Sequence, residues 1–235
     1  MSNELQKDAL SIAILAGGKS SRMQGNDKGL LSFNGKSVLS RITGISYGFS
    51  SDVFVIANNN LEKYEKIHKP VYTDILDDFQ GPLSGIYTAL KKCKNEKLII
   101  LPCDGPFINR EYFEVLLSYR SNKSIQVIKT GSRLQPVYAC IDSYLVNNLE
   151  VFLQSGERKI DKWYTSCGFD EVLFNHDNEM FLNINSKEDI EINKDLIRKL
   201  YGYKKDCMVH YWFRPLLKRI NRFNAYIRKC RLISK

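Results

Sequence analysis

The sequence predicts an α/β fold, in which helices cover a mostly parallel sheet, and three observations support that prediction. Several short apolar runs lack alternation of polar and apolar residues, which is typical of strands buried on both faces of a parallel sheet. Segments with helical periodicity separate these runs, as the crossover connections between parallel strands require. The chain has 235 residues, of which 43% are hydrophobic, so it can bury the core of one domain.

The first 130 residues alternate between the two kinds of segment. The longest apolar runs have the sequences SIAILA, DVFVIA and KLIILP, and the first of them stops at two glycines. We expect strands at 11–16, 52–57, 71–73, 97–102 and 124–129, with helices at 37–49, 61–68, 83–93 and 109–120. Ligands bind beyond the carboxyl ends of the strands in such a sheet. The polar loops at 17–28, 58–60 and 103–106 are therefore candidates for a functional site.

From residue 135 the pattern changes. We expect strands at 136–141, 172–174 and 181–184, with helices at 143–153 and 187–200. These elements would complete the sheet and form a lid over it. No clear linker occurs before Gly202, which follows the last expected helix.

The positive charge of the chain is confined to its C-terminal end. Residues 199–235 hold eleven Lys and Arg against the single acid Asp206, a net charge of +10, which leaves −1 of the total +9 for residues 1–198. The sequence therefore divides into a nearly neutral domain at 1–198 and a basic extension at 199–235. Because the domain has no cationic excess, we expect no specific nucleic acid as a partner.

The basic extension has the pattern of an amphipathic helix after Pro215. Its apolar residues step by four and three positions along one stripe, which consists of Leu216, Ile220, Phe223, Ile227 and Cys230. Such a helix lies on an anionic membrane surface, docks on an acidic protein, or packs its stripe on its own domain. The sequence leaves these alternatives open.

The six cysteines and three histidines show no metal or disulfide pattern. No C-x-x-C pair occurs, the histidines are far apart in the sequence, and no apolar stretch reaches 18 residues. The first residues also lack the basic and apolar segments of a secretory signal. We therefore expect a reduced, cytoplasmic protein.

The loop after the first expected strand has the chemistry of a phosphate site. Gly17 and Gly18 allow backbone N–H groups to approach a phosphate closely, and Arg22 and Lys28 supply cations for a polyphosphate. The Walker pattern G-x-x-x-x-G-K-[ST] and the dinucleotide pattern G-x-G-x-x-G are both absent. A second candidate is Asp104, at the end of a strand, where a carboxylate suits Mg²⁺ bound to substrate phosphates.

Three motifs occur in order along the chain. The run L-A-G-G-x-x-x-R-M-x-G-x-D-K-G-L begins at Leu15, G-P-L-S-G begins at Gly81, and P-C-D-G-P contains Asp104. Together these motifs resemble those of the molybdenum cofactor guanylyltransferases, a branch of the nucleotidyltransferases. The resemblance spans residues 11–198. It implies a three-layer α/β/α Rossmann-like nucleotidyltransferase fold with a mostly parallel central sheet, to which the C-terminal helical extension is added.

The resemblance also implies roles for individual residues. It implies that Arg22, Lys28 and Asp104 act in catalysis, with Asp104 as the Mg²⁺ ligand. The implied nucleotide-binding residues are Leu15, Ala16, Gly17, Gly18, Lys28, Asn58, Asp74, Gly81 and Asp104. A carboxylate at Asp74 can accept hydrogen bonds from both N1–H and the N2 amine of guanine, a pair of donors that adenine lacks. Asn58 can bond the base or the ribose, although the family often has its asparagine two positions earlier, where this chain has Ile56.

Three further segments resemble the acceptor pocket of that family. Their sequences are Q-P-V-Y-A from Gln135, G-E-R-K from Gly156 and N-I-N-S-K-E-D from Asn183. The implied acceptor-binding residues are Gln135, Arg158, Lys159, Asn183 and Asn185. Amides and cations of this kind suit a pterin that carries a phosphate.

The sequence thus predicts an enzyme that transfers GMP from GTP to molybdopterin, or to its molybdenum-bound form. Pyrophosphate is released and molybdopterin guanine dinucleotide is the product. We expect Mg²⁺ as the cofactor, a monomer, and a molybdoenzyme or cofactor-delivery protein as a partner. Two alternatives stay open. One is a cytidylyl- or uridylyltransferase acting on a sugar or polyol phosphate or on molybdopterin, and the other is a non-catalytic adaptor that has kept the fold.

Overall fold

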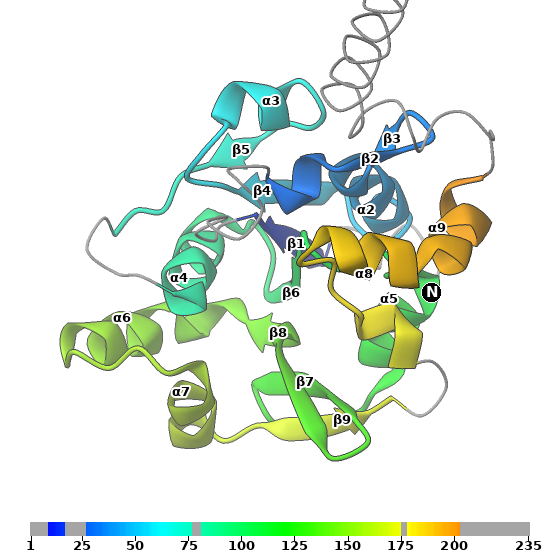
Figure 1. Ribbon diagram of the computed structural model, residues 1–235. Helices are drawn as coiled ribbons and strands as arrows, with labels where there is room; N and C mark the ends of the chain where they lie inside the picture. The colour runs from blue at the N-terminus through cyan, green and yellow to red at the C-terminus, as the bar shows by residue number, and fades with distance from the viewer. Residues whose placement is uncertain (1–8, 17–26, 77–80, 175–177, 203–235) are drawn as a thin grey trace, which may run out of the picture.

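A sheet of seven strands forms the centre of the protein, as the computed structural model in Figure 1 shows. The structure describes residues 9–16, 27–76, 81–174 and 178–202. The strand order is β5-β4-β1-β6-β8-β7-β9. Neighbouring strands are parallel except where β8 pairs with β6 and with β7. The expected α/β fold with a mostly parallel sheet is therefore confirmed.

The strands of this sheet follow the expected order along the chain. They are β1 (Leu10–Leu15), β4 (Asp52–Ile56), β5 (Val71–Tyr72), β6 (Lys97–Pro102), β7 (Ile125–Thr130), β8 (Arg133–Asp142) and β9 (Asp170–Leu173). The structure also contains a short hairpin that the sequence did not predict, formed by β2 (Ser32–Phe33) and β3 (Lys36–Ser37). Because β8 runs against β6, the first residues of β8 lie at the edge where β1, β4 and β6 end.

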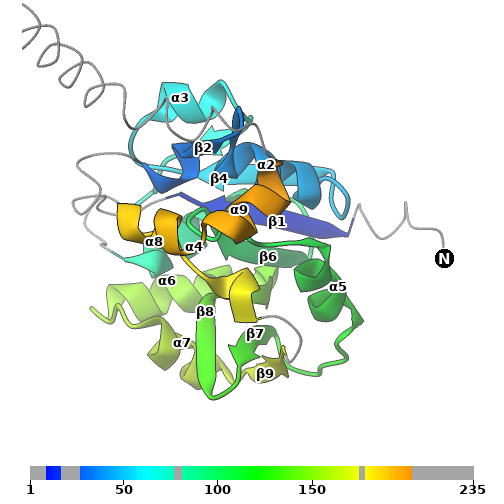
Figure 2. The same ribbon diagram turned by 45° about the vertical axis from the view of Figure 1, so that its right-hand side comes forward.

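Helices cover both faces of the sheet. The α-helices are α2 (Val38–Ser46), α3 (Leu61–Glu65), α4 (Pro82–Lys92), α5 (Arg110–Ser118), α6 (Val146–Gln154), α7 (Ile160–Cys167), α8 (Lys187–Ile192) and α9 (Lys194–Tyr201). Short 3-10 helices lie at η2 (Lys28–Leu30), η3 (Ser143–Leu145) and η4 (Asn178–Phe181). In Figures 1 and 2, α3 and α7 lie at opposite ends of the molecule, beside the two edges of the sheet.

Capping residues set the starts of two of these helices. The Ser37 hydroxyl accepts a hydrogen bond from the Ser40 N–H at 3.0 Å, and the Asn109 side chain accepts one from the Glu111 N–H at 2.8 Å. Each cap satisfies an N–H group that has no partner inside its helix. The helices therefore begin close to where the sequence places them.

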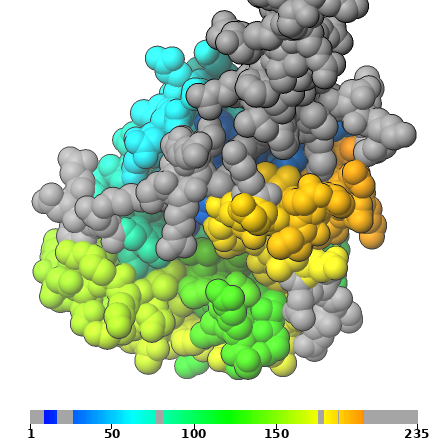
Figure 3. All heavy atoms as spheres, viewed as in Figure 1, coloured from blue at the N-terminus to red at the C-terminus, as the bar shows by residue number. Residues whose placement is uncertain are grey.

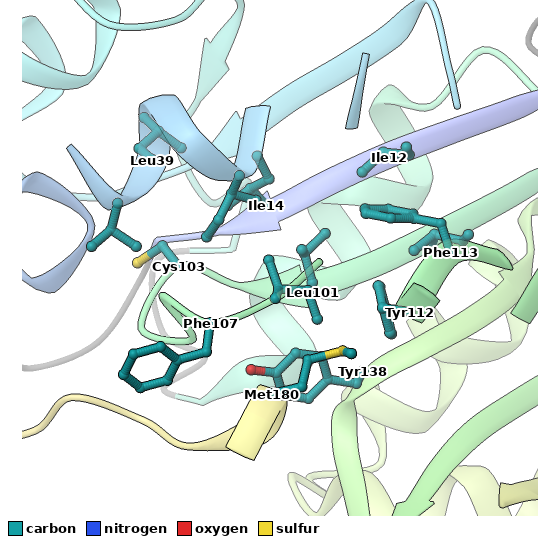
Figure 4. Packing of buried hydrophobic residues seen from close by; sticks show 14 of the residues in the cluster. Ile12, Ile14, Leu39, Leu101, Cys103, Phe107, Tyr112, Phe113, Tyr138 and Met180 are labelled. Atoms are coloured by element: carbon teal, nitrogen blue, oxygen red, sulfur yellow. The ribbon is translucent and has the colours of Figure 1, made fainter. Parts of the chain in front are cut away.

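Alternate residues of one strand enter different cores, which explains the continuous apolar runs. Ile12 and Ile14 of β1 belong to the cluster that includes α2, α5 and α9, whereas Ala13 belongs to the cluster that includes α4, α6 and α7. Figure 4 shows part of the first cluster, in which Ile12 lies near Phe113 of α5. Two apolar cores on the two faces of one sheet make three layers. The three-layer α/β/α prediction is thus confirmed.

One expected strand is wrong. Residues 181–184 were expected to be extended, but η4 ends at Phe181 and the chain continues without regular structure. The Ile184 side chain is buried, and its N–H donates to the Asp104 carbonyl at 3.1 Å rather than to a strand. The segment is apolar because Phe181, at the end of η4, and Ile184, in the loop that follows, are both buried, with two exposed residues between them.

The last expected helix is two helices. Residues 187–200 were expected to be continuous, but α8 ends at Ile192 and α9 begins at Lys194. The Asn193 side chain donates to the Asp189 carbonyl at 2.8 Å, and its backbone leaves the helical conformation with a φ of −97° and a ψ of 16°. The helix α7, which ends at the cap residue Gly168, was not predicted from the sequence.

The structural expectations for the basic extension lie mostly outside the described residues, which end at Gly202. This holds for the amphipathic stripe after Pro215 and for its three alternative roles. No helix within the described ranges is long and apolar enough to cross a membrane.

Candidate active site

The ends of three parallel strands are joined by hydrogen bonds at one edge of the sheet. The Ala16 N–H donates to the Ile56 carbonyl at 2.7 Å, and the Cys103 N–H donates to the Leu15 carbonyl at 3.0 Å. These bonds extend the pairing of β1 with β4 and β6 by one residue beyond each strand. The loops that follow β1, β4 and β6 therefore start from a rigid edge, as the strand-end argument requires.

Lys28 and Asp104 meet at this edge, although 76 positions separate them in the sequence. The Lys28 Nζ lies 3.2 Å from the Asp104 Oδ2, and the same ammonium group donates to the Asn185 Oδ1. The Lys28 and Asp104 side chains are 25% and 24% exposed. Both groups are therefore partly shielded from water while an approaching phosphate can still reach them.

The turn that carries Asp104 is fixed by contacts from distant segments. The Asp104 carbonyl accepts from the Ile184 N–H at 3.1 Å, and the Pro106 carbonyl accepts from the Tyr201 hydroxyl at 3.1 Å. In Figure 3, residues 178–202, in yellow to orange, lie beside the blue N-terminal part of the chain. The C-terminal part of the described chain thus holds the carboxylate loop in place.

Asn58 and Asp74 form a reciprocal pair after β4 and β5. The Asn58 Nδ2 donates to the Asp74 Oδ2 at 2.9 Å, and the Asp74 N–H donates to the Asn58 Oδ1 at 2.9 Å. The Asp74 Oδ1 is buried and has no hydrogen-bond partner among the residues that the structure describes. This oxygen is an unused acceptor close to Gly85 of α4, where a Cβ would lie 3.7 Å from it. Gly81 is exposed, immediately before α4, with a φ of +132° that favours glycine.

Asn185 lies at the start of α8, which is stabilised by a capping box. The Ser186 hydroxyl accepts from the Asp189 N–H at 3.1 Å, while the Asp189 Oδ2 accepts from the N–H groups of Ser186 and Asn185 at 2.9 and 2.8 Å. The cap fixes the backbone of Asn185, whose side chain reaches Lys28. Asn183 is exposed on the same loop. The structure thus places one predicted acceptor residue, Asn185, beside the predicted nucleotide residues.

The other predicted acceptor residues make local contacts. The Gln135 Nε2 donates to the Thr130 Oγ1 at 3.0 Å across the turn between β7 and β8. The Arg158 guanidinium donates to the Leu153 and Glu157 carbonyls at 2.9 and 2.7 Å. Lys159 is exposed immediately before α7. Within the described part of the chain, no hydrogen bond joins Gln135 to Lys28, Asp104 or Asn185.

The predicted residues Gly17, Gly18 and Arg22 lie outside the described residues, between Ala16 and Asp27. Leu15 and Ala16, at the end of β1, are buried, and their backbone groups are already used in the sheet edge. They can form the floor of a site through their side chains.

Residues 12–172 match the family model of the MobA-like NTP transferase domain. The chain belongs to this family. A molybdenum cofactor guanylyltransferase from Photobacterium profundum is 34% identical over 182 residues, which cover 77% of this chain and 93% of the relative. The resemblance drawn from the motifs is therefore confirmed.

Solved structures of similar fold extend this finding. Molybdopterin-guanine dinucleotide biosynthesis protein A from Archaeoglobus fulgidus aligns with a TM-score of 0.66 at 20% identity, over 80% of this chain and 99% of that one. A 4-diphosphocytidyl-2C-methyl-D-erythritol synthase from Anaerococcus prevotii aligns with a TM-score of 0.64 at 13% identity, over 84% of this chain and all of the other. At these identities the likeness shows the fold, which is the nucleotidyltransferase fold expected for a MobA-like chain.

Few side chains of this MobA-like site could coordinate a metal ion. The described residues contain no group of three or more His, Cys, Asp or Glu that could hold a metal ion. Asp104 and Asn185 do place a carboxylate and an amide oxygen on the same ammonium group of Lys28. Mg²⁺ is usually bound through one or two carboxylates, with substrate phosphates and water as its other ligands. The residues present therefore fit that ion when phosphates share its coordination.

Sequence reasoning missed the residues that lie beneath the MobA-like site. Tyr64 and Asp27 are hydrogen-bonded next to Lys28, and Tyr138 lies against Gly105. Burial is the main cause that raises the pKa of the Tyr138 hydroxyl well above its ordinary value, with the nearby Asp104 carboxylate as the next cause. Nothing in the sequence distinguishes Tyr64 and Tyr138 from ordinary buried aromatic residues, because neither their spacing nor a charge indicates that they lie next to the site.

Proposed function

We propose that this protein transfers the GMP unit of GTP to molybdopterin and releases pyrophosphate. The observation that carries the proposal is the pairing of Lys28 with Asp104 at the carboxyl edge of the sheet, with 3.2 Å between Nζ and Oδ2. A cation beside a carboxylate is the combination needed to bind a polyphosphate through a charged amine and a metal ion. The curated relatives named molybdenum cofactor guanylyltransferase support the choice of substrates.

The reaction is a displacement at phosphorus. A terminal phosphate oxygen of molybdopterin forms a bond to the α-phosphorus of GTP, and the bond from that phosphorus to the bridging β-phosphate oxygen breaks. Pyrophosphate leaves with the electron pair of the broken bond. The attacking phosphate is already anionic, so no general base is required. Catalysis consists of positioning and charge neutralisation.

The proposed site residues divide this task between them. Lys28 neutralises charge on the triphosphate, together with Gly17, Gly18 and Arg22 of the preceding loop. Asp104 and Asn185, whose side-chain oxygens both contact the Lys28 ammonium group, are the residues that would bind Mg²⁺. When bound, Mg²⁺ supplies further positive charge to the phosphate oxygens. Because Asp104 also forms an ion pair with Lys28, a metal ion held by Asp104 would weaken that pair and leave the Lys28 amine available to the substrate phosphates.

Recognition of the base falls to the neighbouring strand ends. The buried Asp74 Oδ1 has no partner among the described residues and is available to accept from a guanine N–H. Leu15, Ala16, Asn58 and Gly81 complete the nucleotide-binding residues that we propose. Gln135, Arg158, Lys159 and Asn183, together with Asn185, are the proposed residues of the molybdopterin side.

The setting of the reaction is part of the proposal. The catalytic domain comprises residues 1–198 and acts as a monomer in the cytoplasm. The product passes to a molybdoenzyme or to a cofactor-delivery protein, and the basic extension at 199–235 contacts an acidic protein or an anionic membrane surface.

Two paired substitutions test the assignment of Lys28 and Asp104. Asp104→Asn and Lys28→Ala are each expected to lower pyrophosphate release from GTP and molybdopterin by about a hundredfold or more. Asp142→Asn and Lys97→Ala are matched controls, because Asp142 and Lys97 form an ion pair of 2.7 Å at the other end of β6. The controls should retain the wild-type rate. Near-normal turnover by Asp104→Asn would remove that carboxylate from the mechanism.

A nucleotide panel distinguishes the second candidate function. The fold similarity to a diphosphocytidyl-methylerythritol synthase makes a cytidylyltransferase acting on a polyol phosphate the specific rival. GTP, CTP and UTP are compared for the rise in thermal midpoint that each causes and for product formation with molybdopterin. We expect the largest effects with GTP. A non-catalytic adaptor would instead bind a partner protein tightly and release no pyrophosphate from any of the three.

A further inference from the structure

The hydroxyl of Tyr64 lies beneath the catalytic edge of the sheet. Tyr64 belongs to α3, and its side chain is fully buried. Its hydroxyl donates a hydrogen bond to the Asp27 Oδ1. Asp27 precedes Lys28 directly, and its carbonyl accepts from the Leu30 N–H at 3.1 Å, which forms the turn of η2. Tyr64 thus holds the residue that immediately precedes Lys28.

The same hydroxyl also adjoins the loop of Asp104. The Cys103 thiol, one residue before Asp104, is buried, and both its Sγ and the Tyr64 hydroxyl lie against Gly29. Cys103 belongs to the core cluster that Figure 4 shows in part. One hydroxyl from α3 therefore contacts the neighbours of both Lys28 and Asp104.

Gly29 shows how closely these three segments approach. A Cβ at Gly29 would lie 2.9 Å from the Tyr64 hydroxyl oxygen and 3.1 Å from the Cys103 Sγ. Cβ atoms essentially never approach other heavy atoms to less than 3.0 Å. The glycine after Lys28 is thus required by the close approach of Tyr64 and Cys103, because any side chain there would separate η2 from the loop of Asp104.

The Tyr64 hydroxyl keeps its proton under all ordinary conditions. Burial raises the pKa of Tyr64 far above its ordinary value of 10.0, and the nearby Cys103 and Asp27 raise it further. A protonated hydroxyl beside a carboxylate is a hydrogen-bond donor to it. The Tyr64 hydroxyl is therefore available as the donor of the bond to Asp27.

We propose that Tyr64 is a positioning residue that sets the separation of Lys28 from Asp104. This inference rests on the proposed function of those two residues. Tyr64 touches no substrate. It connects the turn of Lys28 to the turn of Asp104 through a single hydroxyl, at a site where a phosphate must meet both groups. A displacement of about 1 Å in such a site can lower the rate about a hundredfold.

Tyr64→Phe tests the proposal because it removes only the hydroxyl. Tyr112→Phe is the matched control, since the Tyr112 side chain is equally buried and its hydroxyl donates to the Ile100 carbonyl at 2.6 Å inside the sheet. Both variants lose one buried hydrogen bond, so a similar loss of stability is expected in each. For Tyr64→Phe we expect kcat for pyrophosphate release to fall about tenfold to a hundredfold, while Tyr112→Phe retains the wild-type kcat.

Coupling to Lys28 separates positioning from general loss of stability. In a Lys28→Ala background, Tyr64→Phe is expected to cause no further fall in kcat, because the group that it positions is absent. Gly29→Ala is expected to reproduce the effect of Tyr64→Phe. Gly44→Ala is its control, since no atom lies within 4 Å of a Cβ at Gly44.

A crystal structure of Tyr64→Phe gives a readout that does not depend on activity. We expect the Lys28 Nζ to move away from the Asp104 Oδ2, from its separation of 3.2 Å. An unchanged separation, or an unchanged kcat in an active enzyme, would overturn the proposal. Failure of the proposed function would appear differently, as absence of pyrophosphate release by the wild-type protein, and the structural readout would still decide the role of Tyr64.

Discussion

Gly105→Ala should displace the Asp104 turn, and the structure explains why. A Cβ at Gly105 would overlap the Tyr138 hydroxyl oxygen, far inside the 3.0 Å limit for such atoms. The Tyr138 side chain is buried and packs edge-on against Tyr112 and Phe181, with ring centroids 5.6 and 5.0 Å apart. Figure 4 shows the hydroxyl oxygen turned toward Phe107, in the same turn. Because the ring is held on two sides, the backbone of the turn has to move.

The size of the effect follows from this overlap. The backbone has to move by roughly 1 Å before a carbon and an oxygen reach ordinary contact distance. Overpacking of a core in this way costs about 1–3 kcal/mol in the free energy of unfolding. Asp104 is next to Gly105 and moves with it, so pyrophosphate release should fall about a hundredfold.

A second substitution should reverse the effect. After Tyr138→Phe, the nearest atom to a Cβ at Gly105 is the ring Cζ at 3.4 Å, which is an ordinary contact. The Tyr138 hydroxyl has no hydrogen-bond partner among the described residues, so Tyr138→Phe alone loses no bond within them. Removing a buried polar group without a partner is neutral or stabilising by about 1–3 kcal/mol.

The assay compares wild type, both single variants and the double variant. Urea unfolding gives the free energies, and pyrophosphate release gives the rates. We expect Gly105→Ala to be impaired in both, and Gly105→Ala/Tyr138→Phe to recover most of each loss. If the double variant remained as impaired as Gly105→Ala, the overlap with the hydroxyl would not be the cause.

Two further predictions concern stability. Burial lowers the pKa of His68 below its ordinary value of 6.5, so at low pH the unfolded chain binds this proton more tightly than the folded protein. The free energy of unfolding should therefore fall from about pH 7.5 to about pH 5.5, and His68→Gln should show a shallower fall in urea titrations; equal slopes would exclude His68 as the source. Ser186→Ala removes the cap of α8 and should lower the free energy of unfolding by about 1 kcal/mol. Ser118→Ala is its control, because that hydroxyl bonds only locally to the Val115 carbonyl, and an equal loss in both variants would contradict the capping argument.

The fold was predictable where one physical rule governed the sequence. Strands buried on both faces need apolar residues at every position, and the residues of β1, β4 and β6 show that pattern because alternate side chains enter the two cores. The segment at 181–184 has a similar composition for a different reason. Ile184 is buried by a loop whose N–H bonds to the Asp104 carbonyl. The apolar composition of a short segment indicates that the segment is buried. It does not distinguish a strand from a buried loop.

The site was predictable to the extent that its chemistry requires charged residues in loops. Asp104 follows β6, Lys28 follows the loop after β1, and the structure brings these two charged side chains together at the same edge of the sheet. The contact of Asn185 with Lys28 was not predictable, because it depends on how the chain returns after η4. Tyr64 and Tyr138 gave no signal, since their roles arise from one hydroxyl each within otherwise apolar packing.

The bonds from residues 184 and 185 to the Asp104 carbonyl and to Lys28 have a consequence for protein synthesis. A nascent chain that has not yet produced Ile184 already contains every strand of the sheet, yet it lacks two of the contacts that surround the reacting groups. The described arrangement is therefore completed only when most of the polypeptide has left the ribosome. An unfinished chain would carry the phosphate-binding lysine and its carboxylate partner without the segment that holds them, until residues 184 and 185 have been added.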